Sequence, residues 1–181
     1  RSMGDVTVDA IKGEFGQRVA AGQLIPVEQR PGVPGRAFTT PEMVRLERNT
    51  LQAMRTGQQA YAPLATRLTR QAVQVASPHL SVHQQEAVDR VLANRDRVMA
   101  LEGVAGAGKT TALAAVREGA EWEGYRVEGF APTSRAAQKL ADAGIATSTL
   151  QRHLVRPDVP HDGSKRLYVL DESSLASTKQ M

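Results

Sequence analysis

The sequence predicts an α/β fold in which a parallel β-sheet is preceded by a small, mostly helical N-terminal element. From Leu80 onward, segments with helical periodicity alternate with short apolar segments, a pattern typical of βαβ units and a buried parallel sheet. A glycine-rich segment at residues 103–108 connects a predicted strand to a predicted helix. With 41% apolar residues the chain can also form a packed core, which excludes wholesale disorder.

The N-terminal element is expected to cover residues 4–77, after residues 1–3, which are interpreted as a cloning remnant. Val8, Ile11, Phe15 and Val19 have the spacing of one helix face and predict a helix over residues 7–21, ended by Gly22. Residues 23–29 predict a short strand, and the proline- and glycine-rich residues 30–36 predict a turn.

A second helix is expected to open at a capping box formed by Thr39 and Glu42 and to stop near Gly57. A third helix is predicted over about residues 64–75, and Pro78 marks the boundary with the second domain, residues 78–181. In that domain the predicted helices cover residues 81–94, 109–121, 134–143 and 150–155. The predicted strands cover residues 97–102, 125–131 and 166–170.

The distribution of charge favours a polyanionic partner. The net charge is +4, and residues 1–80 contain the whole surplus, with ten Lys or Arg against six Asp or Glu. Eighteen of the 23 basic residues are arginine, whose planar fork suits phosphate groups. The alternative is that these arginines only belong to ordinary helix faces exposed to water. The absence of cysteine excludes a disulfide scaffold and a thiolate metal site and is typical of a reducing cytoplasm. No apolar segment is long enough for a membrane span.

Residues 103–110 form the strongest motif, since Gly-Val-Ala-Gly-Ala-Gly-Lys-Thr fits the phosphate-loop pattern between a strand and a helix. Glycines allow backbone N–H groups to surround phosphate oxygens, and the following helix directs its positive end at them. Lys109 would contact the β- and γ-phosphates, and the Thr110 hydroxyl would join the coordination of Mg²⁺. The predicted nucleotide-binding residues of this segment are Gly103, Gly106, Ala107, Gly108, Lys109, Thr110 and Thr111. The alternative is a glycine-rich turn with an exposed lysine.

Asp171 and Glu172 follow an apolar strand, and in a parallel sheet the ends of such strands border the ligand crevice. Asp171 is expected to hold Mg²⁺, and Glu172 to orient and deprotonate the water that attacks the γ-phosphate. The same pair could instead cap the turn that follows.

Gln84 is a candidate reader of adenine, because an amide both donates and accepts hydrogen bonds. Ser81 and Gln84 also match a capping box, which leaves both interpretations open. Thr133, Ser134 and Arg135 could grip a nucleic-acid backbone, with Thr149 as a weaker second contact and Arg67 and Arg70 as basic contacts. The alternative for the threonines is an ordinary helix cap.

These motifs, in this order, resemble a RecD-like superfamily-one DNA helicase. Residues 80–84 look like its Q motif, 103–110 motif I, 131–137 motif Ia and 170–174 motif II. The segments GVAGAGKTTAL, APTSRAAQKL and LDESS further resemble the helicase region of TraI/TrwC-type conjugative relaxase–helicases. The resemblance extends from about Phe38 to the end of the chain.

The resemblance implies an incomplete RecA-like sheet with helices on both faces, ATP and Mg²⁺ as ligands, single-stranded DNA as partner and a bacterial cytoplasmic location. It also implies a second RecA-like domain and a relaxase domain in the same parent chain, and contact with the conjugative secretion machinery. Because motifs III to VI and the arginine finger of the second domain are not among these residues, the fragment alone is expected to be inactive. The alternative functions are a single-stranded-DNA-binding module with little hydrolysis and, more remotely, a P-loop kinase.

Overall fold

The computed structural model describes residues 7–28, 32, 35–103, 107–155 and 163–176. The chain forms two compact units, Arg1–Gln52 and Ala53–Met181. Residues 53–77, which the sequence assigned to the N-terminal element, therefore share most contacts with the second unit. The two units are described separately below.

The described residues of the first unit form helix α1 (Val8–Ala20), a small hairpin and all but the last turn of helix α2 (Pro41–Thr56). Helix α1 begins after Thr7, whose hydroxyl accepts from the N–H of Ala10 at 3.2 Å. Strands β1 (Ile25–Val27) and β2 (Ala37–Thr39) pair in antiparallel orientation, and α2 follows. Phe15 of α1 meets Phe38 of β2 edge to face, with ring centroids 4.8 Å apart. None of the described residues of this unit is buried.

The start of α2 differs from the predicted capping box. Thr39 belongs to β2, where it pairs with Ile25, so the residue that precedes the helix is Thr40. The Thr40 hydroxyl accepts from the N–H of Met43 at 3.2 Å, and Pro41 occupies the first helical position, where its missing N–H costs nothing. The predicted capping box of Thr39 and Glu42 was therefore wrong, since the hydroxyl cap comes from Thr40 and the residue three positions later is Met43.

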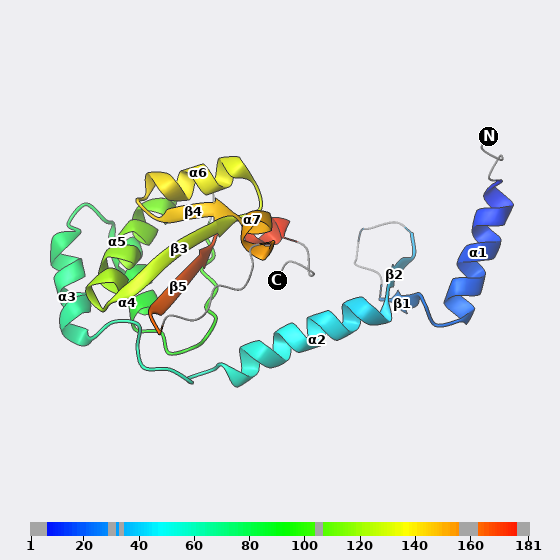
Figure 1. The fold of residues 1–181 in the computed structure, drawn as a ribbon, viewed down its shortest axis with the longest axis horizontal. Helices are drawn as coiled ribbons and strands as arrows, with labels where there is room; N and C mark the ends of the chain where they lie inside the picture. The colour runs from blue at the N-terminus through cyan, green and yellow to red at the C-terminus, as the bar shows by residue number, and fades with distance from the viewer. Residues whose placement is uncertain (1–6, 29–31, 33–34, 104–106, 156–162, 177–181) are drawn as a thin grey trace. The chain divides into compact units, whose positions relative to one another are not determined.

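The second unit contains a parallel sheet of three strands. Strands β3 (Tyr125–Ala131), β4 (Ala146–Thr149) and β5 (Lys165–Leu170) are arranged in the order β4-β3-β5, with β3 in the centre (Figure 1). Phe130 pairs with Ser148 on one side and with Leu170 on the other. Strand β4 was not among the strands predicted from the sequence, although β-branched threonine is a good strand residue.

The strand predicted over residues 97–102 is wrong, since these residues have no strand conformation. The N–H of Arg97 donates to the carbonyl of Gly57 at 2.8 Å, which is not part of a strand ladder. Val98, Met99 and Leu101 are 51%, 37% and 39% exposed. An apolar pattern identifies a segment that can enter a sheet, but a strand also needs a neighbour that supplies its hydrogen bonds.

Helices flank the parallel sheet, which confirms the predicted α/β fold. Helices α5 (Lys109–Trp122) and α6 (Ser134–Asp142) pack on the face of Val127. Gly129 lies on that same face, where a Cβ would come within 2.9 Å of the Ile145 side chain. Phe130 points to the other face and stacks on His153 of α7 (Leu150–Leu154), with ring centroids 4.1 Å apart.

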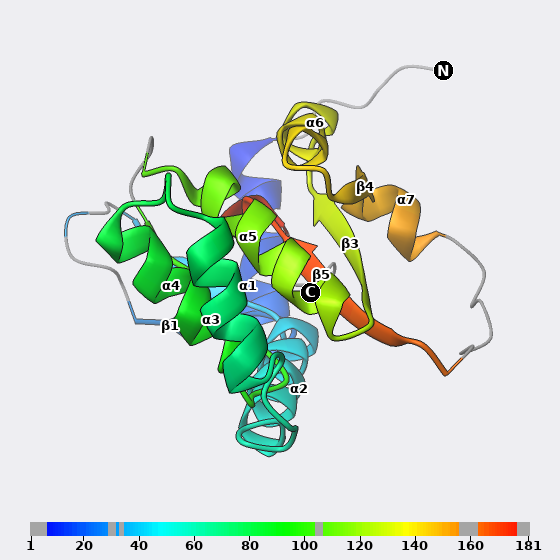
Figure 2. The same ribbon diagram turned by 90° about the vertical axis from the view of Figure 1, so that its left-hand side faces the viewer.

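Helices α3 (Arg67–Ala76) and α4 (Val82–Leu92) pack beside α5, as Figure 2 shows. Their shared core contains Val73, Val88, Leu92 and Val116, each at most 5% exposed. Gly119 permits this close packing, since a Cβ there would lie 2.8 Å from a methyl group of Leu92. The two helices that begin next to the predicted phosphate loop, α4 and α5, are thus joined by one apolar core.

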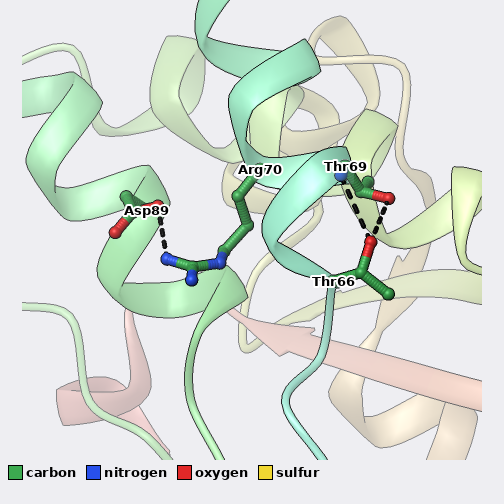
Figure 3. A network of polar contacts seen from close by, with 4 residues as sticks. All are labelled: Thr66, Thr69, Arg70 and Asp89. Carbon is green, nitrogen blue, oxygen red and sulfur yellow. Dashed lines mark hydrogen bonds and ion pairs between the residues drawn. The ribbon is translucent and has the colours of Figure 1, made fainter.

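Polar contacts hold the beginning of α3 in place (Figure 3). The Thr66 hydroxyl accepts from the N–H of Thr69, and Arg70 forms an ion pair of 2.6 Å with Asp89 of α4. The Glu123 carboxylate, at the end of α5, accepts from the Thr69 hydroxyl and from the Thr66 N–H. These hydrogen bonds from Thr69 and Thr66 hold the pKa of Glu123 below its ordinary value.

Candidate functional site

The described part of the phosphate loop has the backbone geometry that its glycines predict. Gly108 has φ of 70°, in the left-handed region that favours glycine, and it precedes the first residue of α5. Gly108 precedes this helix and has no side chain, so it provides no side-chain cap. The N-terminus of a helix preceded by glycine is a favourable position for an anion such as a phosphate.

Lys109, Thr110 and Thr111 form the first turn of α5. The ammonium group of Lys109 donates to the carbonyl of Gly103 at 2.6 Å, which brings the lysine back to the first residue of the loop. Ala107 and Gly103 are described as well, while the predicted residue Gly106 lies outside the described residues. A lysine charge and a helix N-terminus are therefore directed at the same loop.

Gln84 is in direct contact with the loop, 23 residues further along the chain. Its amide nitrogen donates to the carbonyls of Ala107 and Gly108, at 3.2 and 3.3 Å. Its amide oxygen accepts from the N–H of Ser81, and the Ser81 hydroxyl accepts in return, so the capping box is also formed. One side chain thus caps α4 and fixes the loop, and its adenine-reading role stays a prediction.

Asp171 and Glu172 lie at the carboxyl end of β5. The N–H of Asp171 donates to the carbonyl of Phe130 at 2.9 Å and so extends the pairing of β5 with β3. One Asp171 oxygen accepts from the N–H of Glu172, also at 2.9 Å. Glu172 has φ of 51°, a left-handed conformation that costs a non-glycine residue about 1–2 kcal/mol. Such local strain is a feature that gathers at functional sites.

The hydroxyl candidates for DNA contact border the same edge of the sheet. Thr133 follows β3 and caps α6, and Thr149 ends β4 and caps α7, in each case by accepting a backbone N–H. Because the three strands are parallel, the residues after them share one edge with Asp171. Ser134 and Arg135 are exposed in the first turn of α6. Each capping hydroxyl keeps its own proton for a further acceptor.

Arg67 and Arg70 lie on α3 in different surroundings. Arg67 is exposed, whereas the Arg70 side chain is 23% exposed and paired with Asp89. This pairing connects α3 to α4, and the DNA-binding role of both arginines stays a prediction.

Sequence reasoning did not find two contacts that shape the site. The return of Lys109 to the Gly103 carbonyl and the approach of Gln84 to the loop both depend on side-chain conformation. The only sequence signal for the second was the short distance between the two motifs.

Comparison with known families and proteins agrees with this geometry. The AAA domain family matches residues 79–181, more than half of the chain. The chain belongs to this AAA domain family. The match includes the phosphate loop, all three strands of the sheet and the Asp171–Glu172 pair.

Similar proteins include conjugal transfer proteins. A probable conjugal transfer protein TraA of Sinorhizobium fredii is 33% identical over 98% of this chain and 19% of its own length. The conjugal transfer protein TraA of Agrobacterium fabrum is 32% identical over 81% of this chain and 16% of its own length. The multifunctional conjugation protein TraI of Escherichia coli K12 is 29% identical over 93% of this chain and 10% of its own length.

These findings confirm the resemblance to the helicase region of TraI-type conjugative proteins. The chain spans less than a fifth of the length of these relatives. In the part of the AAA domain chain that the structure describes, no helix has the length and apolarity needed to cross a bilayer.

Proposed function

We propose that this chain is the first nucleotide-binding part of an ATP-driven DNA helicase that acts in conjugative plasmid transfer. ATP would bind at the phosphate loop, single-stranded DNA would bind at the sheet edge, and the enzyme would move along one strand. The rest of the same multidomain chain, including a second RecA-like domain and a relaxase domain, would complete the activity in the bacterial cytoplasm. The relatives, which are conjugal transfer proteins by name, support this context.

The geometry of the phosphate loop carries the proposal. Gly108 adopts a conformation that a side chain disfavours, α5 begins without a side-chain cap, and Lys109 lies against the first residue of the loop. A triphosphate would be attracted by the positive end of α5 and would draw the lysine from the Gly103 carbonyl.

Thr110 and Asp171 fit a magnesium ion by their chemistry, since Mg²⁺ takes hydroxyl and carboxylate oxygens. One Asp171 oxygen accepts from the Glu172 N–H, and the second oxygen of the carboxylate is chemically suited to a metal-bound water. Mg²⁺ bound with the nucleotide would neutralise phosphate charge. Glu172 would accept the proton of the attacking water, and its strained backbone supports a role beyond chain reversal.

Thr133, Ser134, Arg135 and Thr149 would hold the DNA backbone, and contacts of this kind to phosphates carry no sequence information. Arg67 and Arg70 would add positive charge. Because these hydroxyls border the same sheet edge as the end of β5, DNA bound to them would lie near the carboxylates of Asp171 and Glu172.

The proposal is tested by measuring the affinities of ATP and ADP for the chain and for Lys109→Ala. The variant should lose more affinity for ATP than for ADP, since the lysine charge reaches the γ-phosphate as well as the β-phosphate. Lys139→Ala, which removes an exposed lysine of α6, is the matched control and should change neither affinity.

Unchanged affinities of Lys109→Ala for both nucleotides would contradict a phosphate site and would favour the single-stranded-DNA-binding module. The chain alone should hydrolyse ATP negligibly, because an arginine finger contributes about 10³–10⁵ in rate. DNA-stimulated turnover above about one per second would contradict the dependence on a second domain.

A further inference from the structure

The sheet face to which Phe130 points carries an aromatic cluster that the proposed phosphate contacts do not use. Phe130 of β3, His153 of α7 and Tyr168 of β5 contact one another, with ring centroids between 4.1 and 5.8 Å apart. Phe130 is 5% exposed and forms the base of the cluster, whereas Tyr168 is 50% exposed. We call Phe130, His153 and Tyr168 the aromatic platform.

Charged side chains of β3 and β5 share this face with the aromatic platform. Arg126 and Arg166 are paired in register, and they lie four and two residues before Phe130 and Tyr168. Because side chains alternate between the faces of a strand, both arginines belong to the face of the platform. Glu128, an acid on the same face, forms an ion pair of 3.3 Å with Arg126. The two arginines outnumber this acid, so the strands give the face a net positive charge.

This pattern does not suit an apolar protein cover. Strands that are buried on both faces of a parallel sheet consist of nearly continuous apolar residues. The opposite face follows that rule, with Val127 and Val169 in its core. A cover on the platform face would instead have to remove water from Arg126, Glu128 and Arg166, which is costly for charged groups. The face therefore suits a ligand that offers both a flat apolar surface and negative charge.

We propose that the aromatic platform stacks a base of single-stranded DNA on Tyr168. Every base has a π-face, and aromatic side chains exposed on a sheet stack the bases of single-stranded nucleic acids. Arg166 lies two residues before Tyr168, about 7 Å along the strand, so a nucleotide stacked on the ring would have its phosphate near that guanidinium.

The platform also continues the proposed DNA-binding edge of the sheet. Thr149 at that edge caps α7, the helix that carries His153 and lies at the carboxyl end of β3 (Figure 1). A strand held by its phosphates at the edge would therefore meet the platform next. This inference rests on the proposed function, which supplies single-stranded DNA as the ligand.

The test compares two labelled oligonucleotides of equal length, oligothymidylate and an abasic chain with the same sugar–phosphate backbone. Their affinities are measured by fluorescence anisotropy with the full 181-residue chain. Tyr168→Thr removes the ring and keeps a residue that favours a strand, and circular dichroism and thermal unfolding check its fold. Loss of one stacked base should weaken binding of oligothymidylate about 5- to 150-fold and leave binding of the abasic chain unchanged. The salt dependence of binding should also stay the same, because the ring carries no charge.

Two variants serve as controls. Tyr168→Phe keeps an aromatic ring and should bind oligothymidylate as the wild type does. Tyr61→Thr removes a tyrosine of the second unit that is 53% exposed and lies outside the sheet, so it should change neither affinity.

Equal affinity of the wild type for the two oligonucleotides, or an equal loss in Tyr61→Thr, would overturn the inference and leave backbone binding at the sheet edge in place. Unchanged affinity of Tyr168→Thr for oligothymidylate would overturn it as well and would favour a protein segment as the occupant of this face. Wild-type chain that binds neither oligonucleotide would overturn both the platform and the proposed DNA contacts. The affinities for ATP and ADP test the nucleotide site separately.

Discussion

Substitution of Gly108 by alanine tests the geometry of the phosphate loop most directly. With φ of 70°, an alanine at this position costs about 1–2 kcal/mol relative to glycine. Its Cβ would also lie within 2.2 Å of the Gln84 amide nitrogen, so that side chain must move away. Gln84 then loses its hydrogen bonds to the Ala107 and Gly108 carbonyls, which adds about 1 kcal/mol for two partly exposed bonds.

These contributions should appear as a loss of nucleotide affinity. The empty loop of the variant relaxes to another conformation, and its return to the phosphate-binding conformation requires the same free energy. A cost of about 2–3 kcal/mol corresponds to roughly 30- to 150-fold weaker binding of ADP, which titration calorimetry or a fluorescent analogue can measure. Thermal unfolding should change less, because the strain is local to the loop.

A double-mutant cycle with Gln84→Ala separates the two contributions. In a chain that already carries Gln84→Ala, Gly108→Ala should cost only the free energy of placing alanine in a left-handed backbone conformation. The cycle should therefore give a coupling free energy of about 1 kcal/mol. Strictly additive losses would refute the contact between Gln84 and the loop. Full ADP affinity in Gly108→Ala would refute the left-handed conformation itself.

Three further predictions test the packing of the second unit. Glu123 has a lowered pKa in the folded chain, so its stabilisation is complete above its ordinary value of 4.5 and is lost as the pH falls through the folded pKa. The free energy of unfolding, measured with urea above and below this pH, should therefore fall more steeply on acidification for the wild type than for Glu123→Gln. Gly129→Ala should destabilise by about 1–3 kcal/mol, because its Cβ would lie 2.9 Å from the Ile145 side chain; unfolding at wild-type urea concentration would contradict the close packing. Arg70→Ala and Asp89→Ala should show a coupling of up to about 1 kcal/mol in denaturant unfolding, and zero coupling would mean that the ion pair does not hold α3 to α4.

Local patterns were sufficient where one segment determines its own structure. The seven residues of β3 were predicted with both ends correct, because Gly124 and Pro132 give clear boundaries to a segment that contains Tyr125, Val127 and Phe130. The start of α5 at Lys109 was also correct, since a glycine in a left-handed conformation precedes it. The family assignment followed from the order of short motifs and needed no tertiary information.

Features that depend on a partner could not be predicted in the same way. Residues 97–102 have the composition of a strand, but strand conformation depends on a neighbour that offers hydrogen bonds. Arg70 was interpreted as a DNA contact from its charge, whereas its pairing with Asp89 depends on the packing of α3 against α4. Gln84 illustrates the same limit, because the sequence motif of Ser81 and Gln84 is the same whether Gln84 only caps the helix or also contacts the loop.

The outer side of β5 has a consequence for handling the protein in solution. Strand β5 pairs with β3 on one side, and no described strand pairs with the other, where the backbone groups can accept a strand from another molecule. Charged residues stand only at its beginning, Lys165 and Arg166, while Tyr168 and Leu170 are 50% and 36% exposed. The substitution Tyr168→Lys would place a further positive charge on β5, and charge on an edge strand opposes pairing with another molecule. At high concentration, such a variant should stay monodisperse in light scattering under conditions in which the wild-type chain associates edge to edge.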